Sequence, residues 1–222
     1  MDRNMEEIKK QLKKKSDVME KVVLDMFLSC GFTGRGATDL EQRRDHIDIF
    51  VTDVLGKIWP KGSTKTIDVK GQKMTGYDRR KNGIIVERCV PQHFPHDIPC
   101  CSVEYTKYGH AGNSVCDNQP DYFMFESTEE GTEPHANDRG RIFQIGKSFY
   151  LIESCIFKEY ALKIYDEHGM RLPEAVHKSK MRGYYHLLIQ FNKESGIYDG
   201  NHYCHIPMDD IRNLPNIYLK IC

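Results

Sequence analysis

The stretch KTIDVKGQK, residues 65–73, alternates polar and apolar side chains, which is typical of a half-buried β-strand. Successive side chains of a strand point to opposite faces, so Asp68 and Lys70 share one face and Ile67 and Val69 share the other. Because Ile67 and Val69 are apolar, we expect their face of the strand to pack against the core. An acid and an amine therefore face the same surface or cleft near its end.

A second alternating stretch, HIDIFVTDV at residues 46–54, precedes the first and predicts another strand. Its branched apolar residues would face the core, and Asp48 would face the opposite side. The turn-rich segment GKIWPKGS, residues 56–63, favours a β-hairpin between the two strands. If they pair in this way, the carboxylates of Asp48 and Asp68 converge with the ammonium group of Lys70.

Two carboxylates and one amine at a single place suit metal-assisted hydrolysis of a phosphodiester. Mg²⁺ takes oxygen ligands at roughly 2.0 to 2.1 Å and is commonly bound by one or two carboxylates, waters and substrate phosphate. A metal ion lowers the pKa of a bound water and stabilises charge on phosphate oxygens, and Lys70 would orient the water or the phosphate. The alternative is a set of solvated strand charges.

The remaining sequence predicts further helices and strands around this hairpin. A helix is expected from Met5 to about Cys30, with apolar residues recurring at three and four positions and Gly31 as its end. Loops are expected at 31–44, 78–83 and 128–140, the last a mobile one, and a hairpin around Gly146 within 141–154. Further strands are expected at 84–90, 101–109, 121–127 and 184–191, and further helices at 155–169 and 206–214.

This order of elements predicts a mixed β-sheet with helices covering its faces, within the α/β (α+β) class. The length of 222 residues favours one sizeable core. We expect residues 1–15 to form a charged helical arm and residues 16–222 to form a single domain with an insertion near 83–101. No internal repeat is visible.

Charge and cysteine content limit the classes of partner. The 32 basic and 32 acidic residues balance, so a polyanion would have to be held by local patches. No apolar segment approaches the length of a membrane span, and no signal peptide is visible, so we expect an intracellular protein without a membrane partner. The eight cysteines are scattered through a chain too long for a disulfide-stapled mini-domain, which favours reduced thiols.

An Asp about twenty residues before an acid-x-Lys triplet, on adjacent strands behind an N-terminal helix, resembles the PD-(D/E)XK nuclease superfamily. Here the residues are Asp48 and then Asp68, Val69 and Lys70. The surrounding segments HIDIFV, TIDVKGQK, SVEYTKYGHAG and PDYFMFE are similar to a bacteriophage-type branch of that superfamily. The resemblance covers residues 18–126, and continues more loosely through YHLLIQF and IPMDDI.

The resemblance implies a restriction-endonuclease-like fold and a Mg²⁺- or Mn²⁺-dependent nuclease that cuts nucleic acid, with DNA as the favoured substrate. It implies that Asp48, Asp68 and the backbone carbonyl of Val69 bind the metal, and that Lys70 orients the attacking water. It also implies that Glu20, on the N-terminal helix, hydrogen-bonds waters of the metal. If the protein is phage-encoded, it acts in the cytoplasm of the host cell.

Several acids near the triplet have an alternative role. Glu20 stands three residues after Asp17, and this spacing also matches a helix-capping box with Asp17 as N-cap. Asp25 competes with Glu20 for the role on the same helix. The strand of Glu104 is expected beside TIDVK, which would make Glu104 a third acid of the pocket; the alternative is a solvent-facing strand charge paired with Lys107. Asp121 follows a proline and favours a turn or capping role.

A cluster of basic residues follows the triplet and would contact nucleic-acid phosphates. Cationic side chains supply the sequence-independent part of nucleic-acid binding. The alternative is a solvated charge run. The residues of this basic cluster are Lys73, Arg79, Arg80 and Lys81.

The segment RCVPQHFPHDIPCC, residues 88–101, carries thiol and imidazole groups that would suit a structural Zn²⁺ in the insertion. It lacks the paired CxxC spacing of familiar zinc fingers. His202, Cys204 and His205 are further ligand types, with no sequence signal that places them nearby. The candidate zinc ligands are Cys89, His93, His96, Cys100 and Cys101.

The sequence departs from the superfamily pattern at three places. Ile47 stands where many members have Pro, and Asp68 stands where many have Glu, which shortens the side chain by one methylene. Gly112 is followed by Asn113 rather than Trp. Two alternatives stay open: a non-catalytic nucleic-acid-binding module on the same fold with a zinc-stapled insertion, and an accessory protein that binds another protein. The sequence is compatible with a monomer or a homodimer.

Overall fold

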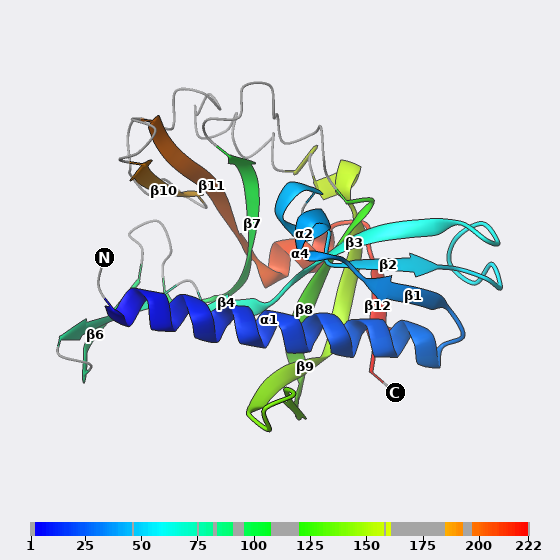
Figure 1. Ribbon diagram of the computed structural model, residues 1–222, viewed down its shortest axis with the longest axis horizontal. Coiled ribbons are helices and arrows are strands. Elements are labelled where there is room, and N and C mark those ends of the chain that lie inside the picture. Colours follow the sequence, from blue (N-terminus) through cyan, green and yellow to red (C-terminus); the bar gives the residue numbers. More distant parts are fainter. Residues whose placement is uncertain are drawn as a thin grey trace. The chain divides into compact units, whose positions relative to one another are not determined.

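Strand β3 (Thr64–Lys70) carries the TIDVK stretch and lies inside a six-stranded sheet of the computed structural model (Figure 1). β2 (Ile49–Thr52) pairs with β3 antiparallel, and β8 (Tyr122–Ala136) pairs with it parallel on the other side. The strand order is β1-β2-β3-β8-β9-β12, where β1 is Thr33–Gly36, β9 is Ile142–Glu153 and β12 is Ile217–Lys220. The predicted β2–β3 hairpin and the mixed α/β class are confirmed.

Two compact units divide the chain. One comprises Met1–Gly71, Gln119–Ser154 and Pro215–Cys222, and the other comprises Gln72–Asn118 and Cys155–Leu214. Each unit is compact, but this does not show whether either unit folds by itself. The single domain over residues 16–222 therefore stays a prediction. The structure describes residues 3–45, 47–74, 76–81, 84–90, 96–107, 120–157, 159–160, 185–192 and 197–221.

Helix α1 (Arg3–Ser29) packs across β1, β2, β3, β8 and β9 of the first unit (Figure 1). Residues spaced by three and four bury its apolar stripe against the sheet, as predicted. The buried residues of this stripe are Val18, Met19, Val22, Val23, Met26 and Phe27. No helix within the described ranges is long and apolar enough to cross a membrane.

A Schellman motif ends α1 at the predicted glycine. Gly31 has φ 84°, a left-handed conformation that glycine adopts without a Cβ penalty. The Phe32 N–H donates to the Phe27 carbonyl at 3.1 Å, and the Gly31 N–H donates to the Leu28 carbonyl at 3.0 Å. The rings of Phe27 and Phe32 meet edge to face with centroids 5.3 Å apart, which is the apolar contact typical of this motif.

Trp59 extends this aromatic contact into the core of the first unit. Its ring lies 6.1 Å from Phe27, 5.9 Å from Phe32 and 5.3 Å from Tyr122, measured between centroids. The turn before Trp59 is held by Asp53, a buried acid at the end of β2. Its carboxylate accepts four backbone N–H groups, from Leu55, Gly56, Ile58 and Trp59, at 2.7 to 3.2 Å.

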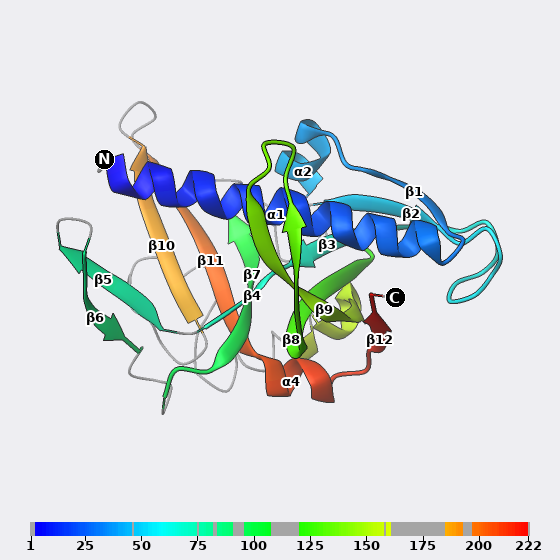
Figure 2. The same cartoon turned by 90° about the horizontal axis from the view of Figure 1, so that it is seen from below.

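The second unit contains a four-stranded sheet in the order β10-β11-β7-β4 (Figure 2). Helix α4 (Met208–Asn213) follows β11 and buries Met208 and Ile211, as predicted for a short closing helix. A separate two-stranded ribbon is formed by β5 and β6. These strands are β4 (Gln72–Met74), β5 (Tyr77–Lys81), β6 (Ile84–Cys89), β7 (Pro99–Lys107), β10 (Tyr185–Asn192) and β11 (Ile197–Pro207).

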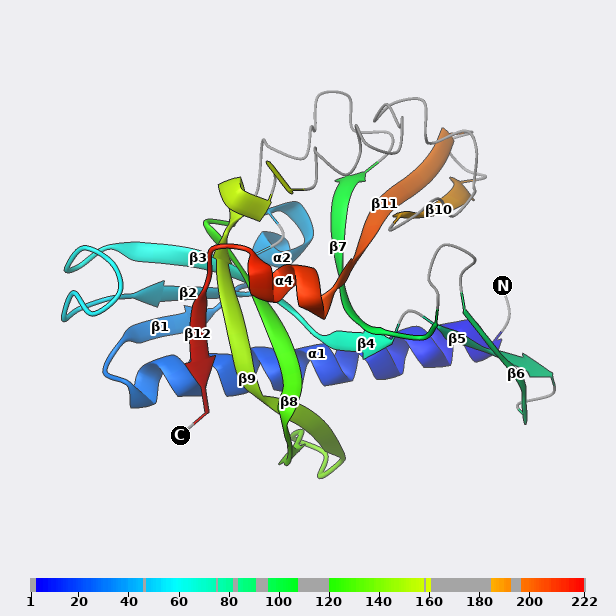
Figure 3. The same cartoon turned by 180° about the vertical axis from the view of Figure 1, so that it is seen from behind.

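Three segments predicted as loops have regular structure, so those predictions are wrong. Residues 31–44 contain β1 and most of α2 (Asp39–Asp45), and residues 78–83 include most of β5. Residues 128–136 continue β8, which is paired with β9 (Figure 3). Their polar composition reflects exposure of the strands to solvent rather than a lack of hydrogen-bonded pairing.

The predicted hairpin around Gly146 is wrong, and the predicted helix 155–169 is confirmed at its described residues. No hairpin turns at Gly146, because β9 runs through it as one strand. A Cβ at Gly146 would lie 2.2 Å from the Ser127 carbonyl oxygen, so the glycine permits close approach of β8 rather than a turn. Residues 154–157 and 159–160 are helical, and the rest of the predicted helix 155–169 lies outside the described residues.

Replacing Asp53 by Asn should destabilise the protein by about 2 kcal/mol. Each oxygen of the carboxylate accepts two backbone N–H groups, and the NH₂ group of Asn cannot accept the two that it would face. Burial alone would raise the pKa of Asp53, but the backbone N–H groups of residues 56–59 outweigh it and lower that pKa. The ionised group therefore stabilises the folded state above about pH 4 and ceases to do so as the pH falls further.

Chemical denaturation at several pH values measures this effect. The difference between the wild type and Asp53→Asn should be largest at neutral pH and should shrink below about pH 4. Asp138→Asn is the matched control, because Asp138 is an exposed turn residue. Equal stability of wild type and Asp53→Asn at pH 7 would contradict the role given to this carboxylate.

Candidate catalytic site

The carboxylates of Asp48 and Asp68 and the ammonium group of Lys70 lie together beside β3. Asp48 precedes β2, and its Oδ2 accepts the Val69 N–H at 2.7 Å. The Lys70 Nζ lies 2.6 Å from the Asp68 Oδ2. The backbone of Asp48 is fixed on both sides, because its N–H donates to the Ile67 carbonyl at 3.0 Å and its carbonyl accepts the Ala37 N–H at 2.8 Å.

Asp68 is a buried carboxylate with a neighbour of the same charge. Burial raises its pKa well above the usual range, Lys70 opposes that shift, and Asp48 adds to it. The neighbouring Asp48 carboxylate thus disfavours the ionised form of Asp68. The arrangement therefore favours a positive charge at this place.

Glu20 of α1 is the third acid of the site. The Ser16 hydroxyl donates to its Oε1 at 2.8 Å, and the Gln42 Nε2 donates to its Oε2 at 3.0 Å. Burial raises the pKa of Glu20 to about 7, with a further contribution from Asp48. Asp17 is not an N-cap, because α1 begins fourteen residues earlier at Arg3, and Asp25 is exposed.

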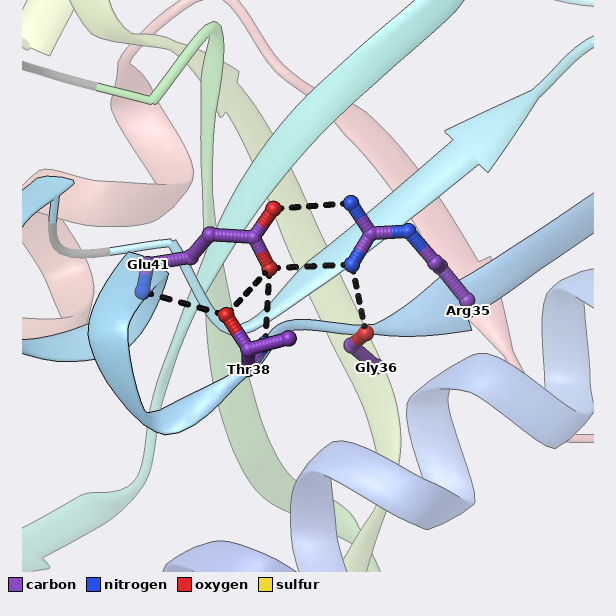
Figure 4. A network of polar contacts seen from close by, with 4 residues as sticks. All are labelled: Arg35, Gly36, Thr38 and Glu41. Atoms are coloured by element: carbon purple, nitrogen blue, oxygen red, sulfur yellow. Dashed lines mark hydrogen bonds and ion pairs between the residues drawn. The ribbon is translucent and has the colours of Figure 1, made fainter.

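A capping box between Thr38 and Glu41 begins α2, the helix that carries Gln42 (Figure 4). The Glu41 carboxylate accepts the Thr38 backbone N–H at 2.7 Å, and the Glu41 N–H donates to the Thr38 hydroxyl at 3.3 Å. Arg35 of β1 clamps the same carboxylate with two hydrogen bonds of 2.8 and 2.9 Å. Its guanidinium also lies 4.0 Å from the centre of the Phe50 ring.

Glu126 of β8 is a fully buried acid that the sequence reasoning did not select. Its carboxylate accepts the Gly146 N–H at 2.7 Å and forms an ion pair with the Lys15 Nζ at 3.1 Å. A Cβ at Gly71, directly after Lys70, would lie 3.4 Å from the Glu126 Oε2. Its position next to PDYFMF, on the strand that pairs with β3, is the signal that could have identified it.

The structure corrects the placement of Glu104. Its strand β7 was expected beside TIDVK, but the neighbours of β3 are β2 and β8, and β7 pairs with β4 and β11. The side chain of Glu104 is not among those described. Asp121 was expected in a turn or capping role, and it lies in the bend before β8, but its carboxylate accepts the Thr66 N–H and hydroxyl of β3, each at 2.9 Å, and so links the two strands.

The predicted basic cluster is distributed over two strands of the second unit. Lys73 is exposed on β4, and Lys81 is exposed at the end of β5. Arg79 and Arg80 lie on β5, where they pair in register with Glu87 and Ile85. Nucleic-acid binding by these residues stays a prediction.

The predicted zinc ligands do not form a described metal cluster. Cys100 and Cys101 are both buried and consecutive in β7, so their side chains point to opposite faces. Cys101 Sγ contacts Met208 Sδ at 3.7 Å, and burial raises the pKa of Cys100 to about 11, which favours the thiol over the zinc-binding thiolate. His93, His202, Cys204 and His205 are outside the described side chains.

Comparison of the chain with models of protein families, with curated proteins and with solved structures found no match. Among the described residues, no three or more His, Cys, Asp or Glu side chains are grouped as metal ligands. The contacts described above define the site as Asp48, Asp68, Lys70 and the adjacent Glu20. Metal binding by Asp48, Asp68 and the Val69 carbonyl stays a prediction.

Replacing Glu20 by Gln should stabilise the metal-free protein as the pH rises. A carboxyl group with a pKa of about 7 in the folded state binds a proton that the unfolded chain has already lost above about pH 4.5. Its unfavourable contribution to folding therefore grows between pH 4.5 and 7. The variant should be more stable than the wild type by about 2 kcal/mol at pH 8 and equal to it at pH 4.

Denaturant unfolding in a chelator, at intervals between pH 4 and 8, measures this difference. Asp25→Asn is the matched control, because it removes an exposed acid from the same helix. A constant difference between wild type and Glu20→Gln over the whole range would disprove the raised pKa.

Proposed function

We propose that the protein is a divalent-metal-dependent nuclease that hydrolyses phosphodiester bonds of nucleic acid, with DNA as its substrate. The observation that carries the proposal is the meeting of Asp48, Asp68 and Lys70 at β3 with Glu20 against them from α1. These side chains come from three segments that are distant in the sequence. A set of solvated strand charges would not account for the burial of Asp68.

The donor set fits a hard divalent cation. Asp48 and Asp68 offer carboxylate oxygens, and the backbone carbonyl of Val69 is the third group that would hold Mg²⁺ or Mn²⁺. Burial, together with the nearby Asp48 carboxylate, raises the pKa of Asp68, and a bound cation would favour its ionised form. When bound, the metal would supply charge stabilisation for the phosphate and a water of lowered pKa.

The protein's own groups divide the remaining tasks. Lys70, held beside Asp68, carries the positive charge that orients the attacking water or a phosphate oxygen. Glu20 has a pKa of about 7, so it can accept a proton from that water near neutral pH. Ser16 and Gln42 fix its orientation, because both donate to its oxygens.

The same proposal includes a restriction-endonuclease-like arrangement for the first unit. A long helix precedes an antiparallel strand pair that bears the acids, and a parallel strand follows on the other side of β3. This order supports the resemblance of the sequence to the PD-(D/E)XK superfamily and its bacteriophage-type branch. An intracellular site of action would accompany such a nuclease.

Replacing Lys70 by Ala should reduce cleavage at least about a hundredfold while DNA binding stays within about twofold of wild type. The protein is incubated with linear, circular and branched DNA and with RNA, in Mg²⁺ and in Mn²⁺, and binding is measured by fluorescence anisotropy in Ca²⁺. Lys61→Ala is the matched control, because Lys61 is exposed in the turn between β2 and β3. It should cut like the wild type.

The outcomes separate the proposed function from its alternatives. Metal-dependent cleavage by the wild type that Lys70→Ala abolishes supports a nuclease. DNA binding without cleavage by any form would instead support a non-catalytic binding module. Absence of both binding and cleavage on every substrate would refute the proposal.

A further inference from the structure

The β5–β6 ribbon of the second unit exposes an unusual run of apolar side chains. Ile84 is 70% exposed, and Ile85 and Val86 are each 52% exposed. The two strands pair with each other and with no other described strand (Figure 2). Contiguous exposed apolar residues on such an element indicate a binding surface.

Charge is distributed unevenly along the ribbon. At its tip, Arg80 pairs in register with Ile85, and Lys81 pairs with Ile84. Residues directly opposite on antiparallel strands share a face, so the exposed side chains of Lys81 and Ile84 lie on one face of the tip and that of Ile85 lies on the other. The acids Asp78 and Glu87 are farther back, opposite Arg88 and Arg79 respectively. The tip is therefore positive and apolar, with no acid in its two pairs.

The base of the ribbon is anchored. Arg88 donates to Asp97 from two nitrogens at 2.7 and 2.9 Å, and the Gly76 N–H donates to the same carboxylate at 2.6 Å. A Cβ at Gly76 would approach the Arg88 and Asp97 side chains to 2.9 Å, so a larger residue there would displace them. The ribbon is held at one end and exposes its tip at the other.

Pairing of the ribbon with a second copy of the chain is disfavoured. The register advances one residue on β5, from Arg79 to Arg80, but two on β6, from Glu87 to Ile85, which leaves Val86 as a bulge. A bulge twists an edge strand and interrupts the hydrogen-bonding row that another strand would extend. Two basic tips brought together would also repel each other.

We propose that the β5–β6 ribbon binds in the major groove of duplex DNA. The major groove of B-form DNA is about 12 Å wide and admits a two-stranded ribbon, whereas the deep, narrow major groove of A-form RNA does not. Lys81 binds a backbone phosphate, and Ile84 and Ile85 contact thymine methyl groups and other apolar base edges. This inference rests on the proposed function and specifies duplex DNA as its substrate class.

Binding of the full-length protein to a 5′-labelled duplex of about 30 base pairs tests the inference, measured by fluorescence anisotropy in Ca²⁺ at several salt concentrations. The double variant Ile84→Ser/Ile85→Ser should bind DNA about tenfold more weakly with an unchanged salt slope. Lys81→Ala should bind more weakly and lower the salt slope by about one. Binding of the same sequence as duplex RNA should be weak and unaffected by either change.

Matched controls alter exposed residues of the first unit. Leu55→Ser removes an exposed apolar side chain, and Lys61→Ala removes an exposed cation. Both should bind duplex DNA like the wild type. Thermal melts should agree for all variants, because each replaced side chain is exposed.

The experiments distinguish a wrong inference about DNA binding by the ribbon from a wrong proposal of nuclease activity. If the wild type cuts DNA and the ribbon variants bind the duplex as tightly as the wild type, the ribbon inference is overturned and the nuclease stands. If the ribbon variants lose duplex binding but the wild type cuts nothing, the inference stands and the nuclease fails. Unchanged DNA binding with a changed oligomeric state in size-exclusion chromatography would show self-association instead, and would overturn the inference.

Discussion

The hydrogen bond from the Val69 N–H to the Asp48 carboxylate joins the two strands on which the candidate site depends. It fixes an acid from the segment before β2 against the backbone between Asp68 and Lys70. If the pairing of β3 shifted by one residue, Asp68 would face the core and Val69 would face the site. This contact and the pairing of β3 with β2 and β8 together fix which side chains β3 presents to the site.

The third acid shows how distant parts of the first unit contribute to one carboxylate. Glu20 belongs to a helix whose opposite stripe is buried in the core, and its orientation depends on Gln42 from α2. The capping box and the Arg35 clamp hold α2 in turn. Side chains exposed to solvent thus support a group whose pKa lies near neutrality.

The sequence was informative where the structure depends on local periodicity. The helix stripe, the β2–β3 pair and the shared face of Asp68 and Lys70 follow from spacings of 3.6 and 2. Two local signals were present but were not used: Thr-Asp-Leu-Glu at 38–41 is a capping box, and Asn-Gly at 82–83 favours a tight hairpin. The error over Glu104 has another cause, because strand order depends on which non-local strand reaches β3, and no spacing encodes that choice.

The ion pair between Lys15 and the buried Glu126 ties the first half of α1 to the strands behind the site. Lys15, the last residue of the stretch that the sequence predicts as a charged arm, thus supplies a counter-ion for an interior carboxylate. Leaving a buried carboxylate without its cation costs about 3 to 5 kcal/mol. A proteolytic fragment beginning at Ser16 would retain every proposed ligand, yet it would fold less stably than the intact chain.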